Sequence, residues 1–321
     1  MIQNYTEDRG EQKPYSVIIP VDHKNADFVK TVIRFIHRNL LEAEHIYIIA
    51  NIDLKSAIMK GENAPHGFSF IDEDSLIPGL SFEDIKRCLV ARPNMTANFT
   101  GWYFQQILKF AFALTDYCGE YYLSWDSDTL PISNLKFFQD GKPLFTAKKE
   151  YHKPYFNTME RLIGIGKTAP FSFIAEHAMF RREFVLELID EINKSVVPGT
   201  TWFEKIINAC EFEIGNTNLF SEFETYGTFC TVKHPNFYGV QYLNTLRSAA
   251  MIRGRHITDT LIDRLSADID IASFEIYDEM FPFDFDKRKL NWQKRIRKYR
   301  RLLSSDGVRK IIRRVKRVFL N

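Results

Sequence analysis

Short apolar runs alternate with helical patterns in the N-terminal part of the chain. The runs at residues 15–21, 45–50 and 67–71 are rich in β-branched and aromatic residues, which is typical of buried parallel strands. Between the first two runs, apolar residues recur at helical spacing over residues 28–36. This order predicts an α/β fold in which right-handed crossovers connect parallel strands.

The clearest helical pattern covers residues 100–114, with Thr100 expected as its N-cap. Trp102, Gln105, Gln106 and Lys109 lie at i, i+3, i+4 and i+7, so they share one face of an otherwise apolar helix. Buried amide and ammonium groups need partners. The polar face is therefore either an edge exposed to water or the wall of a polar site, and the pattern alone leaves both open.

Further along, strands are predicted at residues 120–125 and 143–147, and an amphipathic helix at residues 178–192. Neither a GxGxxG motif nor a P-loop is present, so a bound nucleotide would have to be held by other means. No linker is evident before Pro282, which predicts one domain over residues 14–285 between a short flexible N-terminus (1–13) and a C-terminal extension (286–321).

Charge separates that extension from the rest of the chain. The formal net charge is only +2, but residues 287–321 hold fifteen Lys/Arg and one acid, a net +14, so the preceding 286 residues carry −12. Apolar residues recur at helical spacing among these charges, which is typical of a basic amphipathic helix bound to an anionic membrane. Nucleic-acid binding and docking on the acidic body are the competing interpretations, and without a recognition fold we expect no nucleic acid.

The N-terminus has no apolar core of a signal peptide, and no stretch is long and apolar enough to span a bilayer. Four widely spaced cysteines favour reduced thiols. We therefore expect a cytoplasmic protein that is peripheral on the inner face of the cytoplasmic membrane.

The pattern D-x-D is the strongest candidate for chemistry, although it occurs four times. The pairs are Asp72/Asp74, Asp126/Asp128, Asp268/Asp270 and Asp284/Asp286. Only the second pair directly follows a strongly apolar strand and precedes a Pro turn, and ligands of α/β sheets bind at the carboxyl ends of strands. Paired carboxylates suit Mg²⁺ or Mn²⁺ bridging a diphosphate, provided that an extended chain points both to one side.

Residues 101–109 (GWYFQQILK) and 121–131 (YYLSWDSDTLP) together resemble the nucleotide-sugar half of GT-A glycosyltransferases. The chain is similar in particular to bacterial surface-polysaccharide (capsule and lipopolysaccharide) glycosyltransferases, which also carry a segment like residues 221–227 (SEFETYG). The resemblance implies a GT-A-like fold with a mixed, mostly parallel central sheet, and a basic helical extension follows it. It also implies a divalent metal (Mn²⁺ or Mg²⁺) held by Asp126 and Asp128, and a nucleotide-sugar donor. The residues expected to bind the donor are Val21, Asp22, His23, Trp102, Gln105, Gln106, Lys109, Asp126 and Lys233.

His234 is the candidate for a third metal ligand. Glycogenin-like transferases place a metal-binding histidine in an H-x-x-G-x-x-K-P-W segment, whereas here the glycine falls two places later and K-P-W is missing. A neutral imidazole suits Mn²⁺. The competing interpretation of a lone histidine is a hydrogen-bonded structural residue.

An inverting transfer needs a carboxylate base, for which Glu222 and Glu224 are the candidates because Ser221 can cap a helix that begins there. First-turn acids are also common partners of the helix dipole. Glu176 and His177 are a weaker pair of candidates, and with Tyr226 they are expected to bind the acceptor.

These observations predict a metal-dependent glycosyltransferase that moves a sugar from a nucleotide donor to a bacterial surface glycan, capsule, lipopolysaccharide or exopolysaccharide, on a lipid carrier. Lys233, Arg247 and Arg253 are candidates for stabilising the leaving diphosphate. The alternatives are a sugar-phosphate nucleotidyltransferase, and a non-catalytic protein that binds membranes or nucleic acid through its basic tail. The sequence does not distinguish a retaining from an inverting mechanism.

Overall fold

The computed structural model describes residues 13–60, 66–276 and 278. The basic extension, the predicted N-terminal segment up to residue 12 and the Asp284/Asp286 pair lie outside the described residues. Within them, no helix is long and apolar enough to cross a membrane.

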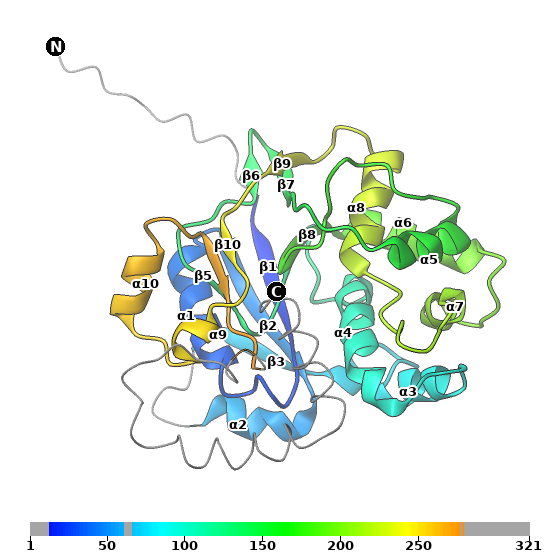
Figure 1. Ribbon diagram of the computed structural model, residues 1–321, viewed down its shortest axis with the longest axis horizontal. Helices are drawn as coiled ribbons and strands as arrows, with labels where there is room; N and C mark the ends of the chain where they lie inside the picture. Colours follow the sequence, from blue (N-terminus) through cyan, green and yellow to red (C-terminus); the bar gives the residue numbers. More distant parts are fainter. Residues whose placement is uncertain (1–12, 61–65, 277, 279–321) are drawn as a thin grey trace, which may run out of the picture.

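A five-stranded sheet with the order β3-β2-β1-β4-β8 runs through the centre of the molecule (Figure 1). Its strands are β1 (Tyr15–Val21), β2 (Ala43–Ala50), β3 (Phe68–Asp72), β4 (Tyr121–Trp125) and β8 (His177–Arg181). The first four are parallel, and β8 pairs antiparallel with β4. The predicted α/β class with a mixed, mostly parallel central sheet is confirmed.

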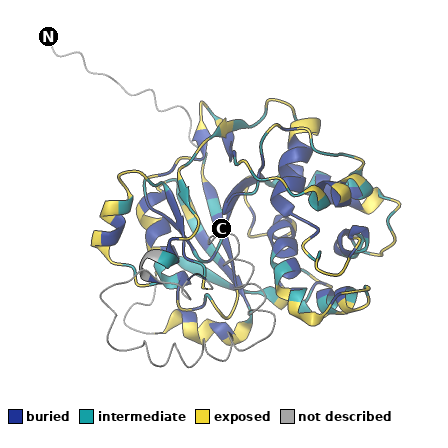
Figure 2. Ribbon diagram, viewed as in Figure 1, coloured by how far each residue is buried: buried dark blue, intermediate teal, exposed yellow. Residues whose placement is uncertain are grey.

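Two apolar layers cover the sheet, because neighbouring side chains of a strand point to opposite faces. In β1, Val17 and Ile19 belong to one buried cluster, with α1 (Val29–Asn39), whereas Ile18 belongs to the other, with α4 (Thr100–Ala111). Figure 2 shows the strands and the inner helices buried and the outer helix faces exposed. A strand buried on both faces must be apolar throughout, which is why the sequence of β1 has no alternation.

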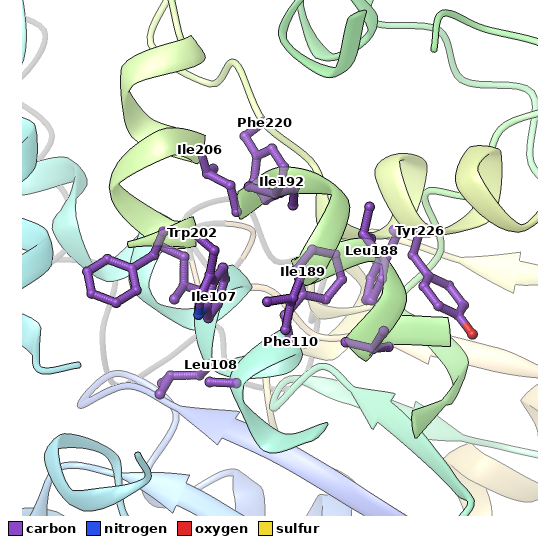
Figure 3. Close-up of a cluster of buried hydrophobic side chains, with 14 of the residues drawn as sticks. Ile107, Leu108, Phe110, Leu188, Ile189, Ile192, Trp202, Ile206, Phe220 and Tyr226 are labelled. Atoms are coloured by element: carbon purple, nitrogen blue, oxygen red, sulfur yellow. The ribbon is translucent and has the colours of Figure 1, made fainter. Parts of the chain in front are cut away.

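Helices gather on the α4 side of the sheet (Figures 1 and 3). They are α3 (Phe82–Val90), α4, α5 (Lys153–Ile163), α6 (Arg182–Lys194), α7 (Trp202–Ala209) and α8 (Glu222–Lys233). Figure 3 shows Ile107 and Phe110 of α4 lying among apolar side chains of α6 and α7. Helix α8 is buried over most of its length, and a Cβ added at Gly227 would lie 2.2 Å from the ring of Phe173. Only glycine therefore allows this approach.

Smaller elements complete the fold. Two three-stranded sheets are formed by β5 (Thr129–Pro131), β10 (Thr245–Leu246) and β11 (Ile271–Ser273), and by β6 (Phe138–Gln139), β7 (Lys142–Thr146) and β9 (Gly239–Gln241). The short helices are α2 (Lys55–Met59), α9 (Ala250–Arg253) and α10 (Asp259–Leu265), with 3₁₀ turns η1 (Ile52–Leu54), η2 (Glu73–Ser75), η3 (Ala97–Phe99) and η4 (Phe112–Leu114).

Two local predictions are wrong. Thr100 is not the N-cap of α4, because the preceding 3₁₀ turn leads directly into the helix and the cap position is Phe99. Residues 178–192 are not one helix, because β8 occupies the first part and α6 begins at Arg182. The apolar run 178–180 adds an antiparallel strand beside β4, and a short buried strand cannot be told from a buried helix by periodicity alone.

Candidate functional site

Every strand of the central sheet has a polar residue at one common edge. Glu73 follows β3, Asn51 follows β2, Asp22 follows β1 and Asp126 follows β4. The antiparallel strand β8 begins at this edge, so Glu176 lies there too, and its carbonyl accepts a hydrogen bond from the Asp126 amide at 2.9 Å. The strand order places these five residues in the row 73-51-22-126-176.

The reversal of strand order falls in the middle of this row. From β1 the chain proceeds through β2 and β3 on one side, and β4 lies on the other. In open α/β sheets ligands bind outside the carboxyl ends of the strands at such a switch point. Asp22 and Asp126 flank it on neighbouring strands, whose spacing is about 4.8 Å.

A cavity of about 300 Å³ opens over the ends of β1, β2 and β3. It is lined by Pro20, Val21, Asp22, His23, Asn51, Leu54, Glu73, Asp74, Phe82, Glu83, Gly101, Phe104, Gln105 and Leu108. Four of the predicted donor-binding residues, Val21, Asp22, His23 and Gln105, therefore share one cavity. Acids and amides line it but no lysine or arginine, so it disfavours an anionic group and suits one that donates hydrogen bonds and has an apolar face.

Glu73 is the most perturbed acid of this cavity. Burial, together with the neighbouring Asp74 and Asp72 carboxylates, raises the pKa of Glu73 to about 7, and a hydrogen bond from Asn51 opposes the shift. Asp74 accepts a hydrogen bond from the Phe82 amide at 2.6 Å, which fixes it at the cavity wall. Near neutral pH, Glu73 can therefore donate as well as accept a hydrogen bond.

Lys109 lies on the side of α4 that faces α8, where it is 3% exposed. Its Nζ donates to Asp126 Oδ1 at 3.1 Å and to Glu222 Oε1 at 2.6 Å, and it lies 4.2 Å from the centre of the Phe223 ring. Burial disfavours its charge, but the Asp126 and Glu222 carboxylates outweigh burial and raise the pKa of Lys109 to about 12. Gln106 Oε1 accepts from the Glu222 amide at 3.3 Å. The polar groups of Lys109 and Gln106, on the polar face of α4, therefore find their hydrogen-bond partners in α8 and Asp126 rather than in water.

Asp126 and Asp128 bind different partners. Residues 126–128 form a turn, closed by a hydrogen bond from the Thr129 amide to the Asp126 carbonyl, and are not an extended segment. Asp126 is paired with Lys109, whereas Asp128 is hydrogen-bonded to Glu275. Burial, followed by Glu275 and Asp126, raises the pKa of Asp128 to about 8. The expectation that an extended chain would aim both carboxylates to one side is wrong.

Basic residues reach the row on the Glu176 side. Arg247 Nε lies 3.0 Å from Glu176 Oε1 and Lys148 Nζ lies 3.6 Å from Glu176 Oε2. Arg247 also pairs with Glu150, and it keeps 53% of its side chain exposed. Both Glu176 and Asp126 raise the pKa of Arg247 against the effect of its burial. An exposed arginine thus lies within the electrostatic reach of Asp126.

Three other predicted site residues lie in the interior. His177 stacks on Trp125, its Nε2 is 2.8 Å from Thr146 Oγ1, and burial lowers its pKa to about 3, so it is neutral. Glu224 is buried and accepts a hydrogen bond from Ser172. Tyr226 is fully buried, and its hydroxyl accepts from the Arg181 amide and contacts the hydroxyl of Tyr238.

Trp102 of α4 does not line the cavity and packs against the apolar cluster, with its ring centre 4.7 Å from that of Tyr103. Lys233 and His234 lie at the C-terminal end of α8. Helix α8 is twelve residues long, about 18 Å, and Glu222 lies at its opposite end. His234 Nε2 is 2.6 Å from Glu187 and its ring stacks on Phe184, and Lys233 is 3.5 Å from Glu191. The structure therefore does not bring either residue to the Asp126 turn. The side chain of Arg253 is not described.

Two residues of the row, Asn51 and Glu73, belong to no sequence motif. Asn51 and Glu73 directly follow apolar runs, as Asp126 does, so the strand ends were the signal that could have identified them. Asn25, Arg255 and Glu275 have no such signal, since they reach the Asp126–Asp128 turn only through tertiary contacts.

A divalent cation fits this site only in part through protein ligands. Asp128 and Glu275 form a carboxyl pair of hard oxygen donors, and Asp126 lies two residues before Asp128 in the same turn. Within the described ranges, no group of three or more His, Cys, Asp or Glu side chains is placed to hold a metal ion. The donor set matches Mg²⁺ sites in which one or two carboxylates act together with substrate phosphates and water.

The fold and the row of strand-end residues define an α/β protein with a candidate ligand site at its topological switch point. The chain belongs to a family of unknown function, DUF6492, whose model matches residues 22–257. No curated protein matches the sequence.

Several solved structures are similar to the larger part of the chain. Galactosyltransferase LgtC, in complex with donor and acceptor sugar analogues, matches with a TM-score of 0.40 and 12% identity over 88% of this chain and 94% of its own. Mouse xyloside xylosyltransferase 1 matches with a TM-score of 0.37 and 9% identity over 81% and 97%. 4-Diphosphocytidyl-2C-methyl-D-erythritol synthase from Anaerococcus prevotii DSM 20548 matches with a TM-score of 0.32 and 11% identity over 72% and 90%. Similarity at this level does not assign an activity.

Proposed function

We propose that this protein is a GT-A-like glycosyltransferase that takes a sugar from a nucleotide-sugar donor. The observation that carries the proposal is the row of strand-end residues. At one end of the row lies the cavity, which has no lysine or arginine in its lining, and at the other end lie Arg247 and Lys148. A nucleotide sugar has the same polarity, because a neutral nucleoside is followed by an anionic diphosphate. The motif resemblance of residues 101–131 supports the same class.

In this proposal the nucleoside occupies the cavity. The apolar walls from Phe82, Phe104 and Leu108 contact the base, and carboxylates accept hydrogen bonds from its amino groups and from the ribose hydroxyls. A carboxylate is a common partner of a ribose 2′-hydroxyl. Asp22 is the best placed for this role because it joins the cavity to the Asp126 strand.

The diphosphate then lies along Asp126, Asp128 and the exposed Arg247. Arg247 stabilises the negative charge that develops on the leaving nucleoside diphosphate, which is the kind of electrostatic assistance that such transfers require. Asp126 and Asp128 would hold a divalent cation, Mn²⁺ or Mg²⁺, together with the phosphates. When bound, the cation supplies neutralisation of the diphosphate charge.

Glu222 has a different role in this proposal from that of a general base. Its carboxylate is buried against Lys109, so it holds the lysine that in turn orients Asp126. Glu222 and Lys109 are therefore positioning residues.

The acceptor is a surface glycan on a lipid carrier in this proposal, and residues 286–321 bring the enzyme to it. A net charge of +14 over residues 287–321 attracts an anionic membrane, at about 1 kcal/mol for each Lys/Arg close to the surface. The protein would then act as a peripheral protein on the inner face of the cytoplasmic membrane.

A thermal-shift panel tests the donor class, because a ligand that binds only the folded state raises the unfolding temperature. The panel contains UDP-, GDP-, dTDP- and ADP-sugars, each with Mn²⁺, Mg²⁺ or EDTA. We expect one nucleotide to stabilise the wild type, and Asp22→Ala to weaken that effect. No stabilisation by any nucleotide would contradict the proposal. A protein that instead binds a nucleoside triphosphate and releases pyrophosphate on adding a sugar phosphate would be a nucleotidyltransferase.

A further inference from the structure

Asn25 links the cavity to the Asp126–Asp128 turn. It lies in the loop after β1, which begins with the cavity residues Asp22 and His23. Its Nδ2 donates to Ser127 Oγ, between the two aspartates, at 3.0 Å. Its backbone amide lies 3.1 Å from Asp22 Oδ1 and 3.0 Å from the Asp22 carbonyl. One residue therefore contacts both parts of the proposed donor site.

Arg255 holds Asn25 from the other side. Its Nη2 donates to Asn25 Oδ1 at 2.5 Å and its Nη1 donates to the Lys24 carbonyl at 3.1 Å. The guanidinium lies 4.2 Å from the centre of the Phe28 ring, just before α1. With its oxygen bound by Arg255, the Asn25 amide can present only its NH₂ group to Ser127, so the direction of that bond is fixed.

The hydrogen bond from Asn25 to Ser127 can fix the position of the Asp126–Asp128 turn. Ser127 is 8% exposed, and it lies in the turn between Asp126 and Asp128, which carry the two carboxylates. Asn25 is itself anchored to α1, because its carbonyl accepts from the Val29 amide at 2.9 Å. The linkage thus connects a rigid helix, the cavity wall and the turn.

We infer that Asn25 is a positioning residue that sets the separation between the nucleoside cavity and the carboxylate turn, so that one ligand can occupy both. This inference rests on the proposed function. A nucleoside alone occupies only the cavity and does not depend on the separation. A nucleoside diphosphate spans both parts, and its affinity depends on how well they are aligned.

The test measures the affinities of two matched ligands by calorimetry. Uridine with UDP, guanosine with GDP, thymidine with dTDP and adenosine with ADP are titrated, in Mg²⁺, into the wild type, Asn25→Ala, Ser127→Ala and the double variant. Loss of one hydrogen bond of this kind weakens binding of the diphosphate about three- to tenfold. We expect that loss for the diphosphate in both single variants, less than twofold change for the nucleoside, and no further loss in the double variant.

Asn208→Ala is the matched control, because that side chain also donates one hydrogen bond, to the Pro198 carbonyl at 2.7 Å, but lies in α7 and does not line the cavity. It should leave both affinities unchanged. Arg255→Lys removes the forked contact with Asn25 and residue 24, and it should reproduce the selective loss.

Three outcomes overturn the inference. Equal losses for nucleoside and diphosphate would mean that Asn25 only stabilises the cavity, and unchanged diphosphate affinity in both single variants would mean that the link has no effect on alignment. Either result leaves nucleotide binding by the wild type, and hence the proposed function, in place. Absence of binding of all four diphosphates to the wild type would overturn the proposed function and this inference together.

Discussion

Replacing Lys109 with methionine tests the buried charge network at the site. Met keeps most of the apolar volume of the lysine side chain but removes the ammonium that lies 2.6 Å from Glu222 and 3.1 Å from Asp126. Asp126 keeps 35% of its side chain exposed and can be solvated, whereas Glu222 keeps 5% and cannot. Removing one partner of such a buried pair costs about 3–5 kcal/mol.

The loss should depend on pH. Burial raises the pKa of Glu222, and Lys109 opposes this shift. Without Lys109, the folded state holds a proton on Glu222 more tightly than the unfolded state does, so stability falls as pH rises above the unfolded pKa of Glu222. Urea unfolding of Lys109→Met should therefore show a larger deficit from wild type at pH 8 than at pH 5.

Two further variants separate this explanation from a simple packing defect. Lys109→Met combined with Glu222→Gln removes the unpaired charge and should recover much of the loss. Lys86→Met removes an exposed lysine paired with Glu83, and it should cost no more than about 1 kcal/mol. A Lys109→Met protein within about 1 kcal/mol of wild type, or a double variant no more stable than the single one, would refute the argument.

Three other predictions address packing, pH and the membrane. Gly227→Ala should lower the free energy of unfolding by about 1–3 kcal/mol or more, as is typical of overpacking, because the new Cβ meets Phe173. Gly101→Ala, which has open space around it in α4, should be neutral or stabilising, and equal unfolding midpoints of the two variants would contradict this. His177 has a pKa of about 3 in the fold, so wild-type stability should fall by up to about 1.4 kcal/mol per pH unit as pH drops from 6.5 towards 3, and His177→Gln should remove that slope from unfolding curves measured across the range. Truncation after Asp286 should release the protein from anionic liposomes in a sedimentation assay, since residues 287–321 carry +14, and undiminished binding would mean that another surface is the anchor.

Much of the architecture could be predicted from the sequence, because β1, β2 and β4 are apolar enough to read as strands buried on both faces. The Asp126 turn and the cavity residues Asp22 and His23 could be predicted for the same reason, since each directly follows a strand and a strand end fixes where the next side chain lies. Strand β8 could not be predicted, because its five residues show no alternation of apolar and polar side chains that would distinguish a strand from a helix. Helical spacing placed Gln105 and Lys109 on one face but could not show that one enters the cavity and the other pairs with α8.

The central claim is that the row of strand-end residues binds a nucleotide sugar for transfer. Its most direct test is the release of nucleoside diphosphate from a panel of nucleotide sugars by the purified protein with Mn²⁺ or Mg²⁺, with and without a lipid-linked glycan fraction as acceptor. We expect the wild type to release nucleoside diphosphate from at least one donor, and a folded Asp126→Ala variant to lose this activity. No release from any donor by the wild type, or equal release by Asp126→Ala, would contradict it.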